Sequence, residues 1–353
     1  MTALPLSRYG KFAVHDTGVP TGDGEYITLL LLHGFVWHSG IFSRMVPFAS
    51  KYNVRLLLVN RRDYPGALAF TETELKPLKA GAAQTSYGAE SMREYLKGRG
   101  RDLHEFLELF IEQERIPKPN GARGGIILAG WSMGAMFTTA LLAYGSSFPV
   151  GKINVATYLR CVLNHDSSNE TLGYPTFEPG YNPIIDLSSK QSTDAFCEWL
   201  SAYYAHGKTP ATLEFRTPLP EPKATTLVMS VDEIQSTTYT PPGQLGGSDL
   251  LLLIYGKRHG TIQEARRRAY LLGADGEGAH GWDEVKLKHV WCEQSAWRGV
   301  MAKFCLEEEA ETARKEGKKF RTHEIVGMKR ANHFIHWDEP ERTLLTLLGK
   351  TDT

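Results

Sequence analysis

The chain has no excess of charge of either sign and no long apolar run. Lys plus Arg and Asp plus Glu both number 40 among 353 residues, so the net charge at neutral pH is zero. Binding to nucleic acid or to an anionic membrane relies on a basic excess, so we expect neither partner. The apolar runs at 27–32 and 250–255 have the length of a strand, and none approaches the length of a membrane span.

Cysteine is scarce and has no metal-binding spacing. The four cysteines (Cys161, Cys197, Cys292 and Cys305) are widely separated, without a CxxC pair. This pattern argues against a zinc site and against a disulfide framework. The segment Met1–Tyr9 lacks the apolar core of a signal peptide. We therefore expect a cytoplasmic protein that binds no metal.

Apolar runs alternate with helical patterns along most of the chain. Runs typical of buried strands lie at 26–32, 53–59, 125–129, 156–163, 285–291 and 319–326. Helical spacing is found at 37–49, 87–116, 135–144, 296–316 and 340–348. Residues 8–15 suggest an opening strand, and the polar stretch 71–85 suggests a surface loop. Such alternation predicts an α/β fold with a mostly parallel, doubly wound sheet.

The stretch 167–284 has a different character. It is rich in Pro, Gly and aromatic residues, and only short helices are indicated, near 193–205 and 262–272. We interpret it as an insertion into a core that consists of 1–166 and 285–353.

The pentapeptide Gly130-Trp131-Ser132-Met133-Gly134 matches G-x-S-x-G. An apolar run precedes it and a helical pattern follows it, which is the strand–turn–helix context of a nucleophile elbow. Ser132 would occupy a strained turn with its hydroxyl exposed. A Cβ at position 130 or 134 would collide with neighbouring backbone.

Other polar residues also follow expected strands. His33-Gly34-Phe35 follows 26–32, Asp166 follows 156–163, and Asn332-His333 follows the last strand. With the elbow and the turn at Asn60–Gly66, this arrangement resembles the α/β-hydrolase superfamily. The resemblance covers roughly 8–166 and 285–350, implies an α/β-hydrolase fold, and places 167–284 where that family inserts a lid after its sixth strand.

The resemblance and the chemistry of the residues assign the same roles. Ser132 is a weak nucleophile without an adjacent base, and His333 is the base that can accept its proton. His336 competes for that role but fits packing better. The backbone amides of Phe35 and Met133 are the expected oxyanion donors.

The acid departs from the family's commoner pattern, in which it follows the seventh strand. That region reads Val290-Trp291-Cys292-Glu293-Gln294-Ser295, with Ser295 where an aspartate is expected. Some family members take the acid from the end of the sixth strand, where this chain has Asp166. We favour Asp166 over Glu293, although Asp166 is equally compatible with a turn or N-cap role.

These residues predict a cofactor-free serine hydrolase that cleaves an ester or lactone of a small hydrophobic substrate through an acyl-enzyme. The insertion supplies aromatics for an apolar pocket or for its own core: Trp199, Tyr203, Tyr204, Tyr239 and Trp282. Acyl transfer, carbon–carbon bond hydrolysis or a lyase reaction remain open, because fold does not fix reaction. A catalytically silent binding protein is the alternative outside enzymology.

Overall fold

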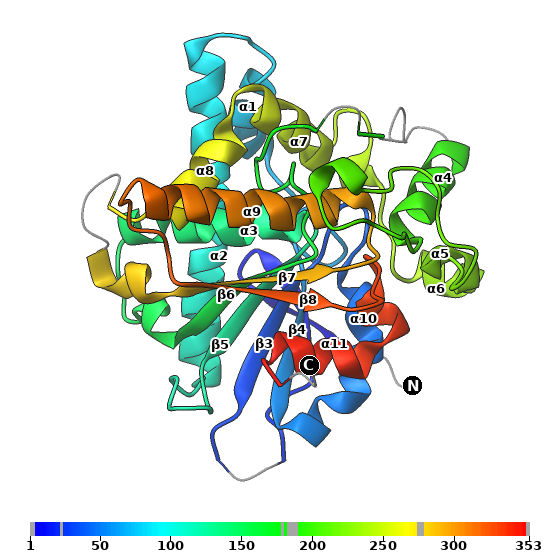
Figure 1. Ribbon diagram of the computed structural model, residues 1–353. Helices are drawn as coiled ribbons and strands as arrows, with labels where there is room; N and C mark the ends of the chain where they lie inside the picture. The colour runs from blue at the N-terminus through cyan, green and yellow to red at the C-terminus, as the bar shows by residue number, and fades with distance from the viewer. Residues whose placement is uncertain (1–3, 22–23, 178–179, 182–189, 274–278, 351–353) are drawn as a thin grey trace.

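The computed structural model describes residues 4–21, 24–177, 180–181, 190–273 and 279–350, and its centre is an eight-stranded sheet (Figure 1). The strands follow the spatial order β1-β2-β4-β3-β5-β6-β7-β8. Their bounds are Leu6–Tyr9 (β1), Phe12–Asp16 (β2), Ile27–Leu32 (β3), Val54–Asn60 (β4), Ile126–Trp131 (β5), Leu159–His165 (β6), Lys286–Cys292 (β7) and His323–Met328 (β8).

The sheet is parallel from β4 to β8 and antiparallel at β1 and β2. Every residue of β3, β4 and β5 is buried, as expected for parallel strands covered on both faces. Residues 8–15 were expected to form one opening strand. They instead belong to the hairpin of β1 and β2, whose turn is made by Gly10 with a φ of 57°.

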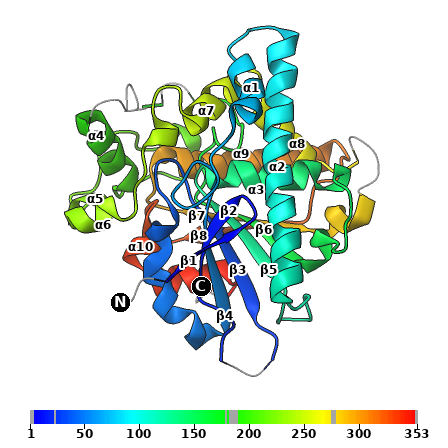
Figure 2. The same ribbon diagram turned by 180° about the vertical axis from the view of Figure 1, so that it is seen from behind.

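Helices cover both faces of the sheet (Figures 1 and 2). One face carries α2 (Ser86–Glu114), α3 (Gly134–Tyr144), α8 (Thr261–Tyr270) and α9 (Trp297–Lys315). The other carries the 3₁₀ helix η1 (Ser39–Phe48), α10 (Ile335–Asp338) and α11 (Pro340–Leu347). The doubly wound α/β architecture expected from the alternation is therefore confirmed.

A helical insertion follows β6, as expected. Its helices are α4 (Lys190–Ser201), α5 (Thr225–Val228), α6 (Val231–Gln235), α7 (Ser248–Arg258) and α8. Because α8 packs against α3 beside the sheet, it also serves as the crossover helix from β6 to β7. In the part of the chain that the structure describes, no helix is long and apolar enough to cross a bilayer.

One local expectation was wrong, and one apolar run of strand length lies in a helix. The polar stretch 71–85 contains α1 (Glu72–Ala80), which begins with a capping box between Thr71 and Glu74. This cap stabilises the first turn despite the polar sequence and Pro77, and α1 lies beside α2 and α7 (Figure 2). The strand-sized run 250–255 lies inside α7, because a short apolar run does not distinguish a strand from a buried helix.

Candidate active site

Ser132 lies in the tight turn between β5 and α3. Its φ of 53° is in the left-handed region, which side chains with a Cβ rarely adopt. A Cβ on Gly130 would stand 2.5 Å from the carbonyl carbon of Gly134, and a Cβ on Gly134 would stand 2.5 Å from the oxygen of Leu32. Both glycines are therefore needed for the backbone to close this turn, as the pentapeptide indicated.

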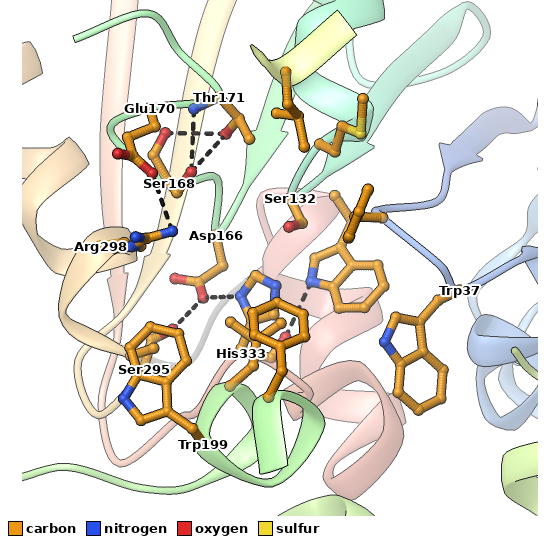
Figure 3. A pocket seen from close by; sticks show the side chains of 18 of the residues that line it. Trp37, Ser132, Asp166, Ser168, Glu170, Thr171, Trp199, Ser295, Arg298 and His333 are labelled. Carbon is orange, nitrogen blue, oxygen red and sulfur yellow. Dashed lines mark hydrogen bonds and ion pairs between the residues drawn. The ribbon is translucent and has the colours of Figure 1, made fainter. Parts of the chain in front are cut away.

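Asp166 and His333 meet at the carboxyl edge of the sheet, although 167 residues separate them in sequence. Asp166 follows β6, and His333 lies in the loop between β8 and α10. The His333 Nδ1 atom is 2.6 Å from Oδ2 of Asp166. In Figure 3 the imidazole lies between the Asp166 carboxylate and Ser132. A carboxylate at Nδ1 fixes the tautomer that leaves Nε2 free to accept a proton.

Two further donors hold the Asp166 carboxylate, which is fully buried. The backbone amide of Cys292 donates to Oδ1 at 2.8 Å, and the hydroxyl of Ser295 donates to Oδ2 at 2.5 Å. Burial by itself raises the pKa of Asp166, but the hydrogen bonds from His333 and Ser295 outweigh it and leave the pKa below its usual value. Asp166 is therefore held as a carboxylate.

Ser132 and His333 line one cavity of about 250 Å³. The Nε2 atom of His333 is buried and has no hydrogen-bond partner among the described residues. A serine–histidine hydrogen bond is often formed only when substrate is bound. No other described protein group therefore occupies Nε2.

The loop after β3 lies beside Ser132. A Cβ on Gly34 would lie 3.0 Å from Cβ of Ser132, so this backbone runs directly against the serine. Phe35 and Met133 both line the cavity. Within the described parts of the chain, neither of their backbone amides donates a hydrogen bond. Both amides are therefore available to an oxyanion.

His33 is held inside this loop and does not line the cavity. Its Nδ1 contacts the Gly34 oxygen at 3.0 Å, and its Nε2 accepts from the Arg61 amide at 3.2 Å. Burial and the nearby Arg61 lower its pKa well below the usual value, so the ring is neutral. His33 therefore holds its loop and does not face the cavity.

A buried ion pair ties the same loop to the insertion. Arg61 donates through Nη1 and Nη2 to the two oxygens of Asp249 on α7, at 2.8 and 2.7 Å. Nη2 of Arg61 also donates to the Gly34 oxygen at 3.0 Å. Tyr64 donates to Asp249 at 2.7 Å and accepts from the amide of Val36 at 3.2 Å. Bidentate pairing of this kind fixes the orientation of α7 relative to the loop that contains Gly34.

The loop that carries His333 is anchored to the insertion through a half-buried carboxylate. The Asp338 carboxylate accepts hydrogen bonds from the hydroxyls of Tyr203 and Thr225, both at 2.6 Å. Asn332, next to His333, donates to the Ser201 oxygen at 2.6 Å and to the Thr225 hydroxyl at 2.8 Å. These bonds connect the α4–α5 part of the insertion to the loop that carries His333.

His336, the competing histidine, is fully buried and is not among the residues that line the cavity. Its ring centroid is 4.6 Å from that of Trp131 and 5.0 Å from that of Phe42. Burial lowers its pKa well below the usual value. The structure thus places His336 in an aromatic layer away from Ser132.

The cavity walls are mostly apolar, with one charged end. Among the insertion aromatics singled out in the sequence, Trp199 lines the cavity, whereas Tyr203, Tyr204, Tyr239 and Trp282 are not among the lining residues. Phe35, Trp37, Phe196 and side chains of α7 complete the apolar part. Glu170, Lys257 and Arg298 form the charged end. These three side chains were not predicted as site residues.

Glu293, the alternative acid, lies apart from this arrangement. Its backbone amide donates to the Met328 oxygen at 3.0 Å, its side chain is half-buried, and it does not line the cavity. Ser295 was singled out as the residue at the usual acid position. Its hydrogen bond to Asp166 was not foreseen, because sequence spacing does not reveal which side chain faces which.

Together, the sheet, the elbow and the Asp166–His333 pair define a hydrolase-type α/β protein. The model of the alpha/beta hydrolase family matches residues 29–344, and the chain belongs to that family. No curated protein sequence matches it.

Solved structures with a similar course of the chain have low sequence identity. One is epoxide hydrolase A from Mycobacterium thermoresistibile, with 12% identity, a TM-score of 0.49, and 98% of this chain and 97% of that chain covered. Another is an esterase from Exiguobacterium antarcticum, with 16% identity, a TM-score of 0.44, and 96% and 95% covered. A third is the carboxylesterase CesB from Bacillus subtilis, with 14% identity, a TM-score of 0.45, and 98% and 90% covered.

Proposed function

We propose that this protein is a serine hydrolase that cleaves an ester or lactone bond of a small, largely apolar substrate through an acyl-enzyme. The observation that supports it most is the Asp166–His333 hydrogen bond beside Ser132 in one cavity. In the triad that activates a serine hydroxyl, a carboxylate orients an imidazole, and the imidazole accepts the proton of the elbow serine.

In the first half-reaction, Ser132 Oγ attacks the carbonyl carbon and His333 Nε2 takes its proton. The Asp166 carboxylate stabilises the imidazolium that forms. The carbonyl oxygen becomes an oxyanion, for which the free amides of Phe35 and Met133 are the donors. As the tetrahedral intermediate collapses, the imidazolium protonates the leaving alcohol, and the acyl group stays on Ser132.

In the second half-reaction, His333 acts on water. Nε2 removes a proton from a water molecule that attacks the acyl carbon, and the same two amides bind the new oxyanion. The imidazolium then returns its proton to Ser132 Oγ, and the carboxylic acid product leaves. A lactone follows the same steps, except that its alcohol stays attached to the product.

The size and lining of the cavity support a small substrate. Its volume of about 250 Å³ lies at or below the lower end of typical ligand pockets, which span roughly 300–1,000 Å³. Phe35, Trp37 and Trp199 offer apolar contact to such a substrate. Epoxide hydrolysis is disfavoured, because relatives with that activity use a carboxylate nucleophile where this chain has Ser132.

Covalent labelling tests the proposal. We expect a fluorophosphonate probe to modify the wild-type protein, with the adduct located by mass spectrometry on the peptide that contains Ser132. Ser132→Ala should lose both labelling and turnover of 4-nitrophenyl butyrate and of a γ-lactone panel. The alanine fits the elbow, so its thermal unfolding should match that of the wild type.

The other reaction classes give different results in the same experiment. Labelling of Ser132 with acyl transfer to an added alcohol exceeding hydrolysis would identify an acyltransferase. Labelling without any ester or lactone turnover would favour a carbon–carbon hydrolase or a lyase. An unlabelled Ser132 and a fully active Ser132→Ala variant would each contradict the acyl-enzyme mechanism, and the absence of both labelling and turnover would indicate a binding protein.

A further inference from the structure

The charged end of the cavity is built from three separate parts of the chain. Glu170 comes from the segment after β6, Lys257 from the last turn of α7, and Arg298 from the first turn of α9. Figure 3 shows Arg298 and Glu170 on the side of the cavity where Asp166 lies, opposite Trp37. Two cations and one carboxylate thus face a cavity that is otherwise mostly apolar.

Glu170 is shared between the two cations. One of its oxygens is 2.9 Å from Nζ of Lys257, and the other is 3.0 Å from Nη1 of Arg298. Burial raises the pKa of Glu170, but Arg298 and Lys257 outweigh this effect and leave the pKa lowered. Both oxygens of the Glu170 carboxylate are therefore bound to a cation.

The Arg298 guanidinium is the less satisfied of the two cations. Its side chain is 12% exposed, against 52% for Lys257, so water solvates the lysine far more than the arginine. Its Nε is buried and has no partner among the described residues. Burial lowers the pKa of Arg298, and Glu170 offsets only part of that effect. A buried cation with an unmatched N–H gains free energy when an anion binds.

Arg298 lines the same cavity as Ser132 and His333. Its neighbour in α9, Gly299, packs directly on the triad carboxylate, because a Cβ there would lie 2.9 Å from Oδ1 of Asp166. Arg298 also lies over Trp199, with its Cζ 5.9 Å from the ring centroid. Apart from this charged end, the one carboxylate among the described lining residues is that of Asp166, which His333, Ser295 and Cys292 already bind.

We propose that Arg298, with Lys257 at the rim, binds a carboxylate carried by the substrate at the end opposite Trp37. The substrate class is then an ester or lactone with a short apolar spacer and a terminal carboxylate, such as the half-ester of a dicarboxylic acid. This inference rests on the proposed ester hydrolysis for its reaction, but the carboxylate subsite is a binding property that can be measured without turnover.

A matched pair of probes tests the subsite. One is mono-4-nitrophenyl adipate, and the other is the 4-nitrophenyl ester of adipic acid monoamide, which has the same shape without the charge. We expect the wild type to favour the carboxylate probe in kcat/KM by about 10- to 100-fold, the range of a hydrogen bond to a charged group. The preference should appear in KM and should weaken as salt is added.

Variants locate the preference. Arg298→Gln should bring the ratio of kcat/KM for the two probes to about one, and Arg298→Lys should restore part of it because the charge returns without the guanidinium geometry. Lys257→Gln, at the exposed rim, should reduce the ratio less. Arg314→Gln, an exposed change on the same helix, is the control that should leave the ratio unchanged.

A binding measurement separates this proposal from the proposed function. Calorimetry on Ser132→Ala should detect monomethyl adipate and show at least tenfold weaker binding of its amide analogue. That result together with no ester turnover by the wild type would reject the hydrolase and keep the subsite. Equal kcat/KM values of the wild type for both probes would overturn the subsite. So would an Arg298→Gln variant that retains the wild-type ratio while both rates fall.

Discussion

The hydroxyl of Ser295 lies 2.5 Å from Oδ2 of Asp166, the same oxygen that faces Nδ1 of His333. Ser295 occupies the position after the seventh strand where the family commonly has its acid, and here its hydroxyl binds Asp166, the residue after the sixth strand that we propose as the acid. The two strands β6 and β7 are neighbours. A carboxylate at either strand end can therefore reach the same imidazole.

Removing the Ser295 hydroxyl should weaken the triad without abolishing it. Burial raises the pKa of Asp166, and the hydrogen bond from Ser295 is one of the interactions that lower it. Ser295→Ala removes this bond, so the pKa of Asp166 should rise. We expect kcat/KM for 4-nitrophenyl butyrate to fall about tenfold and the acid limb of its pH profile to move to higher pH. Ser295→Thr keeps a hydroxyl and should recover most of the activity. An unchanged profile in Ser295→Ala would show that this bond has no influence on the reaction.

The two candidate acids should differ sharply in their effect. Asp166→Asn should reduce kcat by about 10⁴, as loss of the tautomer-setting carboxylate does, whereas Glu293→Gln should change it by less than about threefold because surface substitutions rarely matter more. Circular dichroism and thermal unfolding check that both variants fold. The reverse ranking would move the acid to the seventh strand.

Relocating the acid provides a stronger test of the same geometry. The double variant Asp166→Ser, Ser295→Asp exchanges donor and acceptor across the strand pair. Its kcat should exceed that of Asp166→Ser alone by at least about tenfold, since the imidazole regains a carboxylate. No gain in a correctly folded double variant would mean that a carboxylate at position 295 does not form a hydrogen bond with Nδ1 of His333.

Trp37 should limit the length of an uncharged acyl chain, which avoids the charged end of the cavity and extends the opposite way. Its indole separates the catalytic cavity from a second cavity of about 610 Å³ that is bordered by α4, α5 and α6. Trp37→Ala should join the two and raise kcat/KM for 4-nitrophenyl decanoate relative to the butyrate by about tenfold or more, since each newly buried methylene contributes up to about 0.8 kcal/mol. Adding Met229→Trp, which refills the second cavity, should reverse this gain. An unaltered chain-length preference in Trp37→Ala would argue that the cavities do not communicate through this position.

Buried neutral histidines should make the fold sensitive to acid. Burial lowers the pKa of His165 and His289 to about 4, and that of His336 further. The unfolded chain titrates near pH 6.5, so it binds more protons than the folded chain between these values, and stability must fall as the pH falls from about 6.5 to about 4. Each of the first two should contribute on the order of 3 kcal/mol to this loss.

Urea unfolding across this pH range measures the effect. His289→Leu should flatten the dependence of the unfolding free energy on pH, because the group that must be protonated is gone. The exposed His323 offers a control, since His323→Gln should leave the slope unchanged. A flat wild-type curve between these pH values would contradict the buried, neutral state of the histidines.

The sequence predicted the fold and singled out the residues that meet at the site because both depend on local pattern. Glycines 130 and 134 are required by the turn itself, and Asp166 and His333 each follow an apolar run. Parallel strands then bring their carboxyl ends to one edge, so adjacency follows from topology. The assignment of roles to these residues stays a prediction until the variants above are measured.

What the sequence could not predict depends on contacts between distant segments. Glu170, Lys257 and Arg298 share no spacing or motif, and only the packing of α7 and α9 brings them together. The sequence offers no feature that distinguishes Trp199 from Tyr203 as a pocket residue. In the structure, Trp199 lines the cavity, whereas Tyr203 donates a hydrogen bond to Asp338. The limits 167–284 for the lid likewise remain a proposal, because α8 at its end packs against α3.

The pair formed by Arg61 and Asp249 has a consequence for how substrate reaches Ser132. Swinging α7 outward would separate two buried charges and release the Gly34 oxygen at the same time, and breaking such a pair typically costs about 3–5 kcal/mol. Asp338 also connects the insertion to the loop that carries His333, through hydrogen bonds from the hydroxyls of Tyr203 and Thr225. A hinge motion of the whole insertion would therefore disrupt the loop after β3 and the loop that carries His333 together. We therefore expect substrate and product to pass by rotation of side chains while the helices of the insertion keep their positions. Catalytic turnover should then be insensitive to crosslinks that fix α7 to the sheet.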